Sequence, residues 1–248
     1  VSASYLGMPD VELYTMSENL SVIRNVANAV KVPLIADGDT GYGNAINVMR
    51  TVREFESAGA AAIIFEDQEA PKRCPAVAAT IDILPLEENA GKIAAAVEAR
   101  TDPDTLIVAR TDALSVDDAI RRARAYVAAG ADLVQPISRC FRTIGELRQL
   151  REACGKPLSL QILGWLETDL DKSEIESVAG LAVYPLVSLM SATEAMRRNF
   201  KQLVADKSTQ NLPQPVTSMA DFKAFIGFSD IEELQNRHLM RRVESPYK

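Results

Sequence analysis

The stretch Ala36-Asp37-Gly38-Asp39-Thr40-Gly41-Tyr42-Gly43 follows an apolar run, Val32–Ile35, and precedes a helical pattern that begins near Asn44. Two carboxylates therefore stand where a strand ends and a glycine-rich turn begins. Ligands of parallel α/β proteins bind at this edge of the sheet. Paired carboxylates suit a hard divalent cation such as Mg2+, although Asp and Gly also gather in turns that merely end a strand. On spacing alone, a metal site and a plain turn both remain open.

Two further apolar runs end in charged residues. Ala61–Phe65 is followed by Glu66-Asp67-Gln68, and Leu106–Ala109 is followed by Arg110-Thr111-Asp112. Charges at buried strand ends are costly unless they are paired or bind a metal. Three such ends at one edge of a sheet indicate a functional site.

Apolar runs alternate with helical patterns along the chain, which predicts a parallel α/β sheet. Strands are expected near residues 35, 63, 107, 134, 160 and 182, and helices over residues 17–29, 44–58, 86–100, 116–129, 143–153, 171–178 and 186–205. Ser17 is expected to cap the first helix.

The composition excludes several classes of protein. The 248 residues, 47% of them apolar, suffice for one large domain, and no apolar run approaches the ~20 residues of a membrane span. The net charge of −7 argues against a nucleic-acid surface. Three scattered cysteines indicate a reducing cytoplasm. One histidine, His238, makes a histidine-based triad or a histidine-rich zinc site unexpected.

Five segments together resemble the isocitrate lyase/phosphoenolpyruvate mutase superfamily, in order and spacing, up to about Arg198. They are Leu6–Asp10, Ala36–Gly43, Glu66–Gln68, Pro71–Cys74 and Ala109–Asp112. Within the superfamily the chain looks most similar to short lyases, such as methylisocitrate lyase and dimethylmalate lyase, and to oxaloacetate-decarboxylase-like members.

The resemblance implies a (β/α)8 TIM-type barrel. Its first strand, first helix and second strand are expected to precede Val1, because a βαβ unit needs roughly 30 residues. Residues 1–206 would form the catalytic barrel. Residues 207–248 would form a helical tail that packs on a neighbouring subunit, in a homotetramer with exchanged C-terminal helices.

The resemblance also implies a Mg2+ site, with Mn2+ as an alternative ion. Asp37 would bind the ion directly, and Asp10, Asp39 and Glu66 would hold its waters. Mg2+ keeps several waters in protein sites, so a protein shell that acts mostly through water is reasonable. For Asp10, an ordinary turn or capping role is the alternative.

On the substrate side, the resemblance assigns Arg110 to a substrate carboxylate or enolate, for which a planar guanidinium is suited. A structural salt bridge to Asp112 or Glu66 is the alternative. Tyr5, Gln135 and Gln161 are further substrate contacts by resemblance.

The segment from Asp67 to Pro85, called the long loop below, exceeds the usual length of a βα loop. By resemblance, its Lys72 and Cys74 are catalytic, and the Cys74 thiol protonates the enolate that leaves after carbon–carbon cleavage. The neighbouring cations Lys72 and Arg73 favour a thiolate. The lyases, however, continue with Gly-His where this chain has Pro75-Ala76.

Two further departures concern the substrate side: the lyases carry a Glu near the position of Gln135 and an Asn near Gln161. Three functions therefore compete. The first is a Mg2+-dependent lyase that cleaves a small 2-hydroxy di- or tricarboxylate to pyruvate or glyoxylate. The second is a decarboxylase or hydrolase of oxaloacetate-like 2-oxo acids, with a phosphonopyruvate mutase or hydrolase less favoured. The third is a non-catalytic barrel. We expect the lyase, with a small anionic carboxylic acid as substrate and without nucleic-acid or membrane partners.

Overall fold

The computed structural model describes residues 1–75, 77–78 and 80–239. The chain divides into two compact units, Val1–Pro185 and Leu186–Lys248, and each is described by itself.

The first unit contains a curved parallel sheet of six strands in the order β1-β2-β3-β4-β5-β6. Each strand pairs with the next one along the chain, as expected when helices return the chain to the same edge. The strands are β1 Leu34–Asp37, β2 Ala60–Glu66, β3 Leu106–Thr111, β4 Leu133–Pro136, β5 Leu158–Gln161 and β6 Ala179–Val183. The predicted α/β alternation and all six predicted strands are confirmed. The two strands expected before Val1 stay a prediction.

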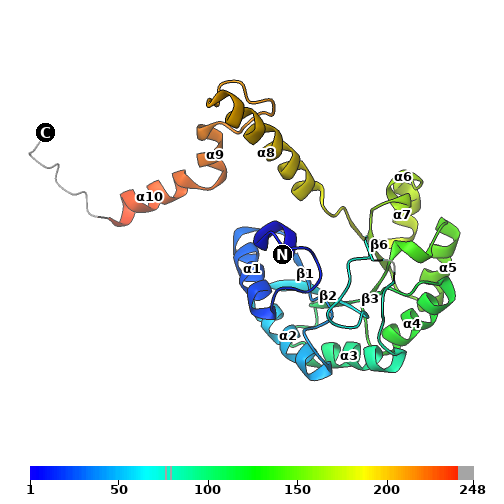
Figure 1. The fold of residues 1–248 in the computed structure, drawn as a ribbon. Coiled ribbons are helices and arrows are strands. Elements are labelled where there is room, and N and C mark those ends of the chain that lie inside the picture. The colour runs from blue at the N-terminus through cyan, green and yellow to red at the C-terminus, as the bar shows by residue number, and fades with distance from the viewer. Residues whose placement is uncertain (76, 79, 240–248) are drawn as a thin grey trace, which may run out of the picture. The chain divides into compact units, whose positions relative to one another are not determined.

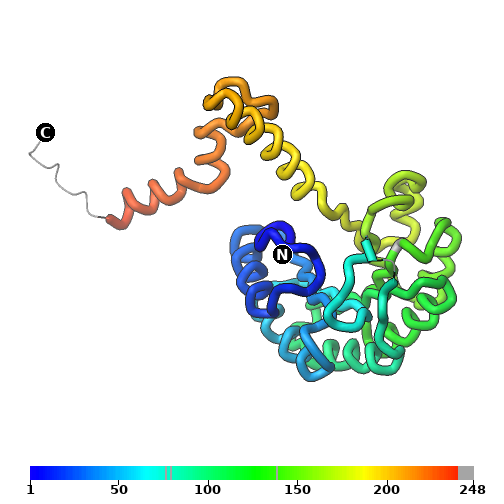
Figure 2. The backbone as a smooth tube through the Cα atoms, viewed as in Figure 1, coloured from blue at the N-terminus to red at the C-terminus, as the bar shows by residue number. Residues whose placement is uncertain are grey.

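Helices follow one another round the outside of this sheet (Figure 1). In Figure 2 the colour runs round the arc in chain order, from blue at the first helix to green at the fifth. The helices are α1 Met16–Ala29, α2 Ala45–Ser57, α3 Leu86–Ala99, α4 Val116–Ala128, α5 Ile144–Cys154, α6 Trp165–Thr168 and α7 Lys172–Val178, with a π-helical turn at Ser2–Leu6 and a 3-10 turn at Ser138–Cys140. The short α6 was not predicted.

The expected cap of the first helix is wrong. Thr15, not Ser17, caps α1: its hydroxyl accepts the Glu18 backbone N–H at 3.3 Å, and Glu18 Oε2 accepts the Thr15 N–H at 2.7 Å. This reciprocal pair needs a Glu or Gln three residues after the cap. Glu18 meets that condition for Thr15, whereas Leu20 does not meet it for Ser17.

Successive side chains of each strand point to opposite faces of the sheet, so that one face forms the core and the other carries the site. Ile63, Phe65 and Ile107 are buried between the sheet and its helices. Because side chains alternate along a strand, Glu66 and Arg110 lie on the opposite face, toward the inside of the curve. In register, Glu66 pairs with Arg110, and Arg110 pairs with Gln135. Sheet topology therefore places three predicted site residues in one row.

The second unit consists of helices α8 Val187–Asp206, α9 Met219–Phe225 and α10 Phe228–His238. The helical C-terminal end is confirmed. By its contacts α8 belongs to this unit, whereas the sequence analysis assigns it to the barrel, and the boundary at residue 206 stays a prediction. Within the described part of the chain, no helix combines the length and the apolarity needed to span a membrane.

Candidate metal and substrate site

The acidic side of the site begins where β1 ends. Asp37 is the last residue of β1 and its side chain is exposed, whereas Asp39 is fully buried. The Asp39 backbone N–H donates to Asp37 Oδ1 at 2.9 Å. Gly38 lies so close to β2 that an added Cβ would stand 2.6 Å from Phe65 Cε1, so this turn requires glycine. The turn delivers one exposed and one buried carboxylate to the same edge.

Two tyrosines orient the buried carboxylate. The hydroxyls of Tyr14 and, at 3.4 Å, Tyr42 donate to Asp39 Oδ2, and Asn19 Nδ2 donates to the Tyr42 hydroxyl at 2.9 Å. Burial raises the pKa of Asp39, and the nearby charge of Asp37 raises it further, while Lys72 opposes both. Sequence reasoning missed Tyr14 and Asn19 because neither stands next to a carboxylate motif.

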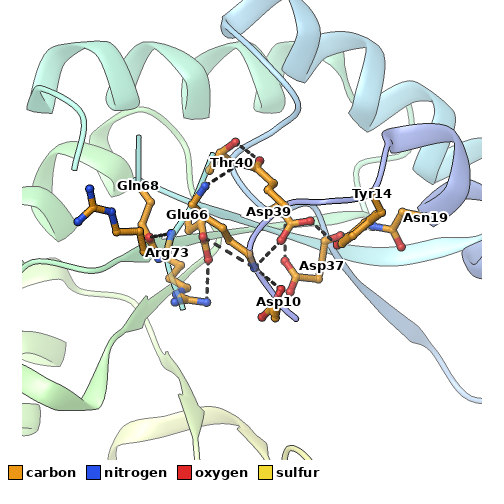
Figure 3. Close-up of polar contacts among 12 residues, drawn as sticks. Asp10, Tyr14, Asn19, Asp37, Asp39, Thr40, Glu66, Gln68 and Arg73 are labelled. Atoms are coloured by element: carbon orange, nitrogen blue, oxygen red, sulfur yellow. Dashed lines mark hydrogen bonds and ion pairs between the residues drawn. The ribbon is translucent and has the colours of Figure 1, made fainter. Parts of the chain in front are cut away.

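Lys72 of the long loop inserts its ammonium among the carboxylates. Its Nζ lies 2.5 Å from Asp39 Oδ1, 3.1 Å from Asp10 Oδ1 and 4.0 Å from Glu66 Oε1. Figure 3 shows Asp10, Asp39 and Glu66 gathered around one another in the site. Burial alone would lower the pKa of Lys72, but the surrounding carboxylates, Asp37 foremost, raise it above its ordinary value. The carboxylates therefore favour the protonated, cationic form of Lys72.

Arg110 links two other carboxylates inside the curve of the sheet. Its guanidinium contacts Glu66 Oε2 at 2.8 Å and Asp112 Oδ1 at 2.9 Å. Burial would lower the pKa of Arg110, but these two neighbours keep it raised. Burial raises the pKa of Glu66, against the opposing charges of Arg110 and Lys72. The salt bridges considered in the sequence analysis are thus both present, and they orient the group predicted to bind substrate.

Asp67, next to Glu66, holds the strand ends together. Its carboxylate accepts the Asp112 backbone N–H at 2.8 Å, the hydroxyls of Thr111 and Tyr126 at 2.8 Å each, and an Arg122 N–H at 3.2 Å. It is fully buried, and burial raises its pKa. Four donors on one carboxylate fix the end of β2 against β3 and α4, a supporting role that sequence reasoning did not assign.

The predicted substrate contacts differ in placement. Gln135 is buried in the row described above, and its Oε1 accepts the Ser159 hydroxyl at 2.8 Å. Gln161 is half-buried at the end of β5. Tyr5 lies 69% exposed in the N-terminal turn, and the structure does not bring it to the carboxylates by any contact among the described residues. The substrate roles of all three stay predictions.

Cys74 of the long loop lies in a backbone turn, and the cations next to it in sequence, Lys72 and Arg73, are paired with other residues. The N–H groups of Val77 and Ala78 donate to the Cys74 carbonyl at 3.1 and 2.9 Å, and Cys74 is half-buried. Arg139 Nη1 donates to the carbonyls of Pro75, at 2.9 Å, and Ala78, at 3.3 Å. Both cations expected to favour the thiolate are paired elsewhere, Lys72 as above and Arg73 with Asp82 at 3.2 Å. Ala76, part of the departure from the lyase pattern, lies outside the described residues.

The donor set suits a hard cation held largely through water. Within the described ranges, no three His, Cys, Asp or Glu side chains are close enough to ligate one ion directly. Glu66 Oε1 is buried and accepts no hydrogen bond from the described residues, whereas buried Asp39 Oδ1 is paired with the Lys72 ammonium. Exposed Asp37, together with the buried Glu66 oxygen that lacks a donor, fits Mg2+, which prefers oxygen ligands and retains water.

Comparison with known proteins assigns the chain to a protein family. The sequence profile described as phosphoenolpyruvate phosphomutase matches residues 1–204. The chain belongs to this family. It is therefore an enzyme of the isocitrate lyase/phosphoenolpyruvate mutase superfamily, and the resemblance stated from the sequence is confirmed.

Individual relatives of this family member carry different activities. The chain is 38% identical over 246 residues to a 2,3-dimethylmalate lyase of Eubacterium barkeri, covering 97% of this chain and 84% of the relative. It is 44% identical over 165 residues to an oxaloacetate decarboxylase of Ectopseudomonas mendocina, covering 66% of this chain and 56% of the relative. The structure of a phosphonopyruvate hydrolase in complex with oxalate and Mg2+ matches with a TM-score of 0.84 at 31% identity, covering 96% of this chain and 84% of that one.

Proposed function

We propose that the protein is a Mg2+-dependent lyase that cleaves a carbon–carbon bond of a small 2-hydroxy di- or tricarboxylate, methylisocitrate-like or dimethylmalate-like, giving pyruvate or glyoxylate and a second acid. The observation that carries this is the convergence of Lys72 on the carboxylates of Asp10, Asp39 and Glu66 while Arg110 is held beside them. The likeness to a 2,3-dimethylmalate lyase over nearly the whole chain supports it.

In this proposal Asp37, Asp39, Glu66 and Asp10 hold Mg2+, or Mn2+ in its place. The bound ion supplies Lewis-acid stabilisation of negative charge on substrate oxygens. Charge that develops on a carbonyl or enolate oxygen during cleavage would then be balanced at the edge of the sheet where these residues lie.

Arg110 binds the substrate carboxylate or enolate. Glu66 and Asp112 accept from two of its nitrogens, so the guanidinium is held in one orientation before substrate arrives. Preorganised charge of this kind lowers the barrier because little reorganisation remains at the moment of reaction. Lys72, kept cationic by its neighbours, adds positive charge to the same side.

Cys74 donates the proton that completes cleavage. The substrate hydroxyl loses its proton to water and becomes the carbonyl of the oxo-acid product, while the electron pair of the broken carbon–carbon bond remains on the leaving acid as an enolate. The thiol proton moves to that carbon, and water then reprotonates the thiolate. Tyr5, Gln135 and Gln161 contact the rest of the substrate in this proposal.

A decarboxylase or hydrolase of oxaloacetate-like 2-oxo acids is the second candidate, and two observations favour it. Pro75 has no N–H to offer a substrate carboxylate where the lyases have glycine. Gln135 is neutral and already hydrogen-bonded to Ser159, so it cannot act as a carboxylate acid or base. The likeness to an oxaloacetate decarboxylase over 165 residues is consistent with these departures.

A product assay separates the two candidates. Methylisocitrate, isocitrate, dimethylmalate, citramalate and oxaloacetate would be offered in parallel with Mg2+, and with chelator as the control. Pyruvate or glyoxylate together with its partner acid, formed from a hydroxy acid, supports the lyase. Pyruvate and CO2 from oxaloacetate alone support the decarboxylase. No metal-dependent turnover of any of them would favour a non-catalytic barrel.

We also propose a cytoplasmic homotetramer in which the C-terminal helices pack on a neighbouring subunit. Among the described residues of Leu186–His238, α8, α9 and α10 contain no buried side chain, and several large apolar ones are exposed, among them Phe200, Phe222 and Phe225. Apolar surface of this extent is typical of interaction sites. The three free cysteines fit a reducing compartment. Light scattering of the Phe222→Asp/Phe225→Asp variant should show a smaller assembly than the unchanged chain.

A further inference from the structure

Glu12, which the sequence analysis did not single out, bridges two separate parts of the site. Its Oε1 accepts the Thr40 hydroxyl at 2.5 Å, and its Oε2 accepts the backbone N–H of Lys72 at 2.9 Å. Thr40 directly follows Asp39, and Lys72 belongs to the long loop. One half-buried carboxylate therefore joins the long loop to the turn that carries the acidic residues.

The end of this bridge at Thr40 is itself held firmly. Thr40 is fully buried, and the ammonium of Lys92, from α3, donates to its carbonyl oxygen. Lys92 is also buried. Because Thr40 is held from α3 on one side and contacts Glu12 on the other, it gives the bridge a rigid anchor.

The backbone of Glu12 is strained. Its φ is +59°, in the left-handed region that side chains other than glycine rarely adopt. Such a conformation persists only where the surroundings stabilise it, and it concentrates at functional sites. The Glu12 carboxylate forms both of its hydrogen bonds from this backbone conformation.

We propose that Glu12 is a positioning residue: it docks the Lys72 backbone on Thr40, so that the Lys72 ammonium stands among Asp10, Asp39 and Glu66. The docking itself is independent of the reaction, and only its consequence for turnover rests on the proposed function. Without the bridge, the Lys72 backbone is no longer fixed, so its ammonium is less well positioned, and the long loop loses a contact with the rest of the site.

Amide hydrogen exchange of the full chain tests the docking without any substrate. In Glu12→Ala, the Lys72 amide should exchange at least about tenfold faster, since it loses a hydrogen bond to a charged acceptor. In Glu12→Gln, the exchange rate of the Lys72 amide should lie between those of Glu12→Ala and the unchanged chain. The glutamine carbonyl can still accept from the Lys72 N–H, and its NH2 group can donate to the Thr40 hydroxyl, which then accepts. Glu69→Gln is the matched control: Glu69 is exposed on the same loop, forms no side-chain bond among the described residues, and should leave exchange unchanged.

Exchange at the amides of β2 and β3 reports whether a variant has unfolded as a whole. If Glu12→Ala destabilises the whole chain, the exchange rate of the Lys72 amide in Glu12→Gln, compared with the unchanged chain, decides whether Glu12 docks the loop. Unchanged Lys72 exchange in both variants, with β2 and β3 still protected, would overturn the proposal.

Turnover supplies a second readout. Loss of positioning should lower kcat more than it raises KM, with partial rescue in Glu12→Gln. If no substrate is turned over by the unchanged chain, the proposed function fails while the exchange result still stands. If turnover is present but exchange does not respond to Glu12→Ala, the positioning role fails and the proposed function survives.

Discussion

The carboxylate side of the site and the long-loop side are built differently. Around Asp39, Glu66 and Arg110, buried charges at strand ends meet in ion pairs, and Lys72 of the long loop supplies one of the partners. Around Cys74, the described residues contribute backbone turns and hydrogen bonds from the Arg139 side chain to loop carbonyls. The comparison teaches that ion pairs fix the charges of the site, whereas backbone turns of the loop position the Cys74 thiol, the group expected to distinguish a lyase from a decarboxylase. Changes on the two sides should therefore have different signatures.

The largest effect is expected from removing the exposed carboxylate of β1. Asp37→Ala should reduce Mg2+-dependent turnover to background, because Asp37 is the proposed direct ligand. Folding should hold, since the ion pairs of Lys72 and Arg110 do not involve it. Turnover, calorimetric Mg2+ binding and thermal melting would be compared with Glu152→Ala, an exposed change on α5. Retained turnover would remove the metal assignment.

The next effect concerns stability on the carboxylate side. Asp67→Ala leaves the buried donors of Thr111, Tyr126 and Arg122 without their acceptor. Breaking a buried ion pair costs about 3–5 kcal/mol, and the lower end is expected because Arg122 keeps Asp118 at 3.0 Å. Urea unfolding measures the loss.

Asp82→Ala, an exposed pair partner on the long loop, serves as its control and should cost at most about 1 kcal/mol. Equal losses in the two variants would show that the strand ends are not held through Asp67.

On the long-loop side, turnover rather than stability should respond. Cys74→Ser should lower the rate of carbon–carbon cleavage at least ~10²-fold if the thiol is the general acid. The melting temperature should hardly change, because Cys74 is half-buried and its backbone carbonyl keeps the bonds from Val77 and Ala78 when serine replaces it. A near-normal rate would move the assignment to decarboxylation, for which this proton donor is not needed.

The smallest effect should come from the contact that holds the Cys74 turn. Arg139→Ala removes two hydrogen bonds to loop carbonyls. The two bonds affect turnover only by holding the Cys74 turn, so turnover should fall about fivefold if about 1 kcal/mol of their contribution is lost, less than in Cys74→Ser. Arg148→Ala, an exposed change on α5, is the control. A larger loss than in Cys74→Ser would show that Arg139 contacts substrate itself.

The pattern of apolar and charged residues was sufficient to predict where the strands end. Apolar runs that stop at Asp37, Glu66 and Arg110 predicted one edge of a parallel sheet, and the observed register places Glu66 beside Arg110. Local pattern was misleading for the cap of α1, where two hydroxyl residues compete and the position of Glu18 decides. The sequence pattern also did not distinguish Gln135, which is buried in the row of site residues, from the half-buried Gln161 and the exposed Tyr5.

The sequence by itself determined the alternation of strands and helices, the family, and the strand-end residues, because hydrophobic period and short motifs are local properties of a chain. Only the tertiary structure decided which groups share the site from a distance: Tyr14 on Asp39, Glu12 on Lys72, and Arg139 on the Cys74 turn. Such pairs join segments that have no common period. A side chain's hydrogen-bond partner depends on where the fold brings two backbones together, and no single segment contains that information.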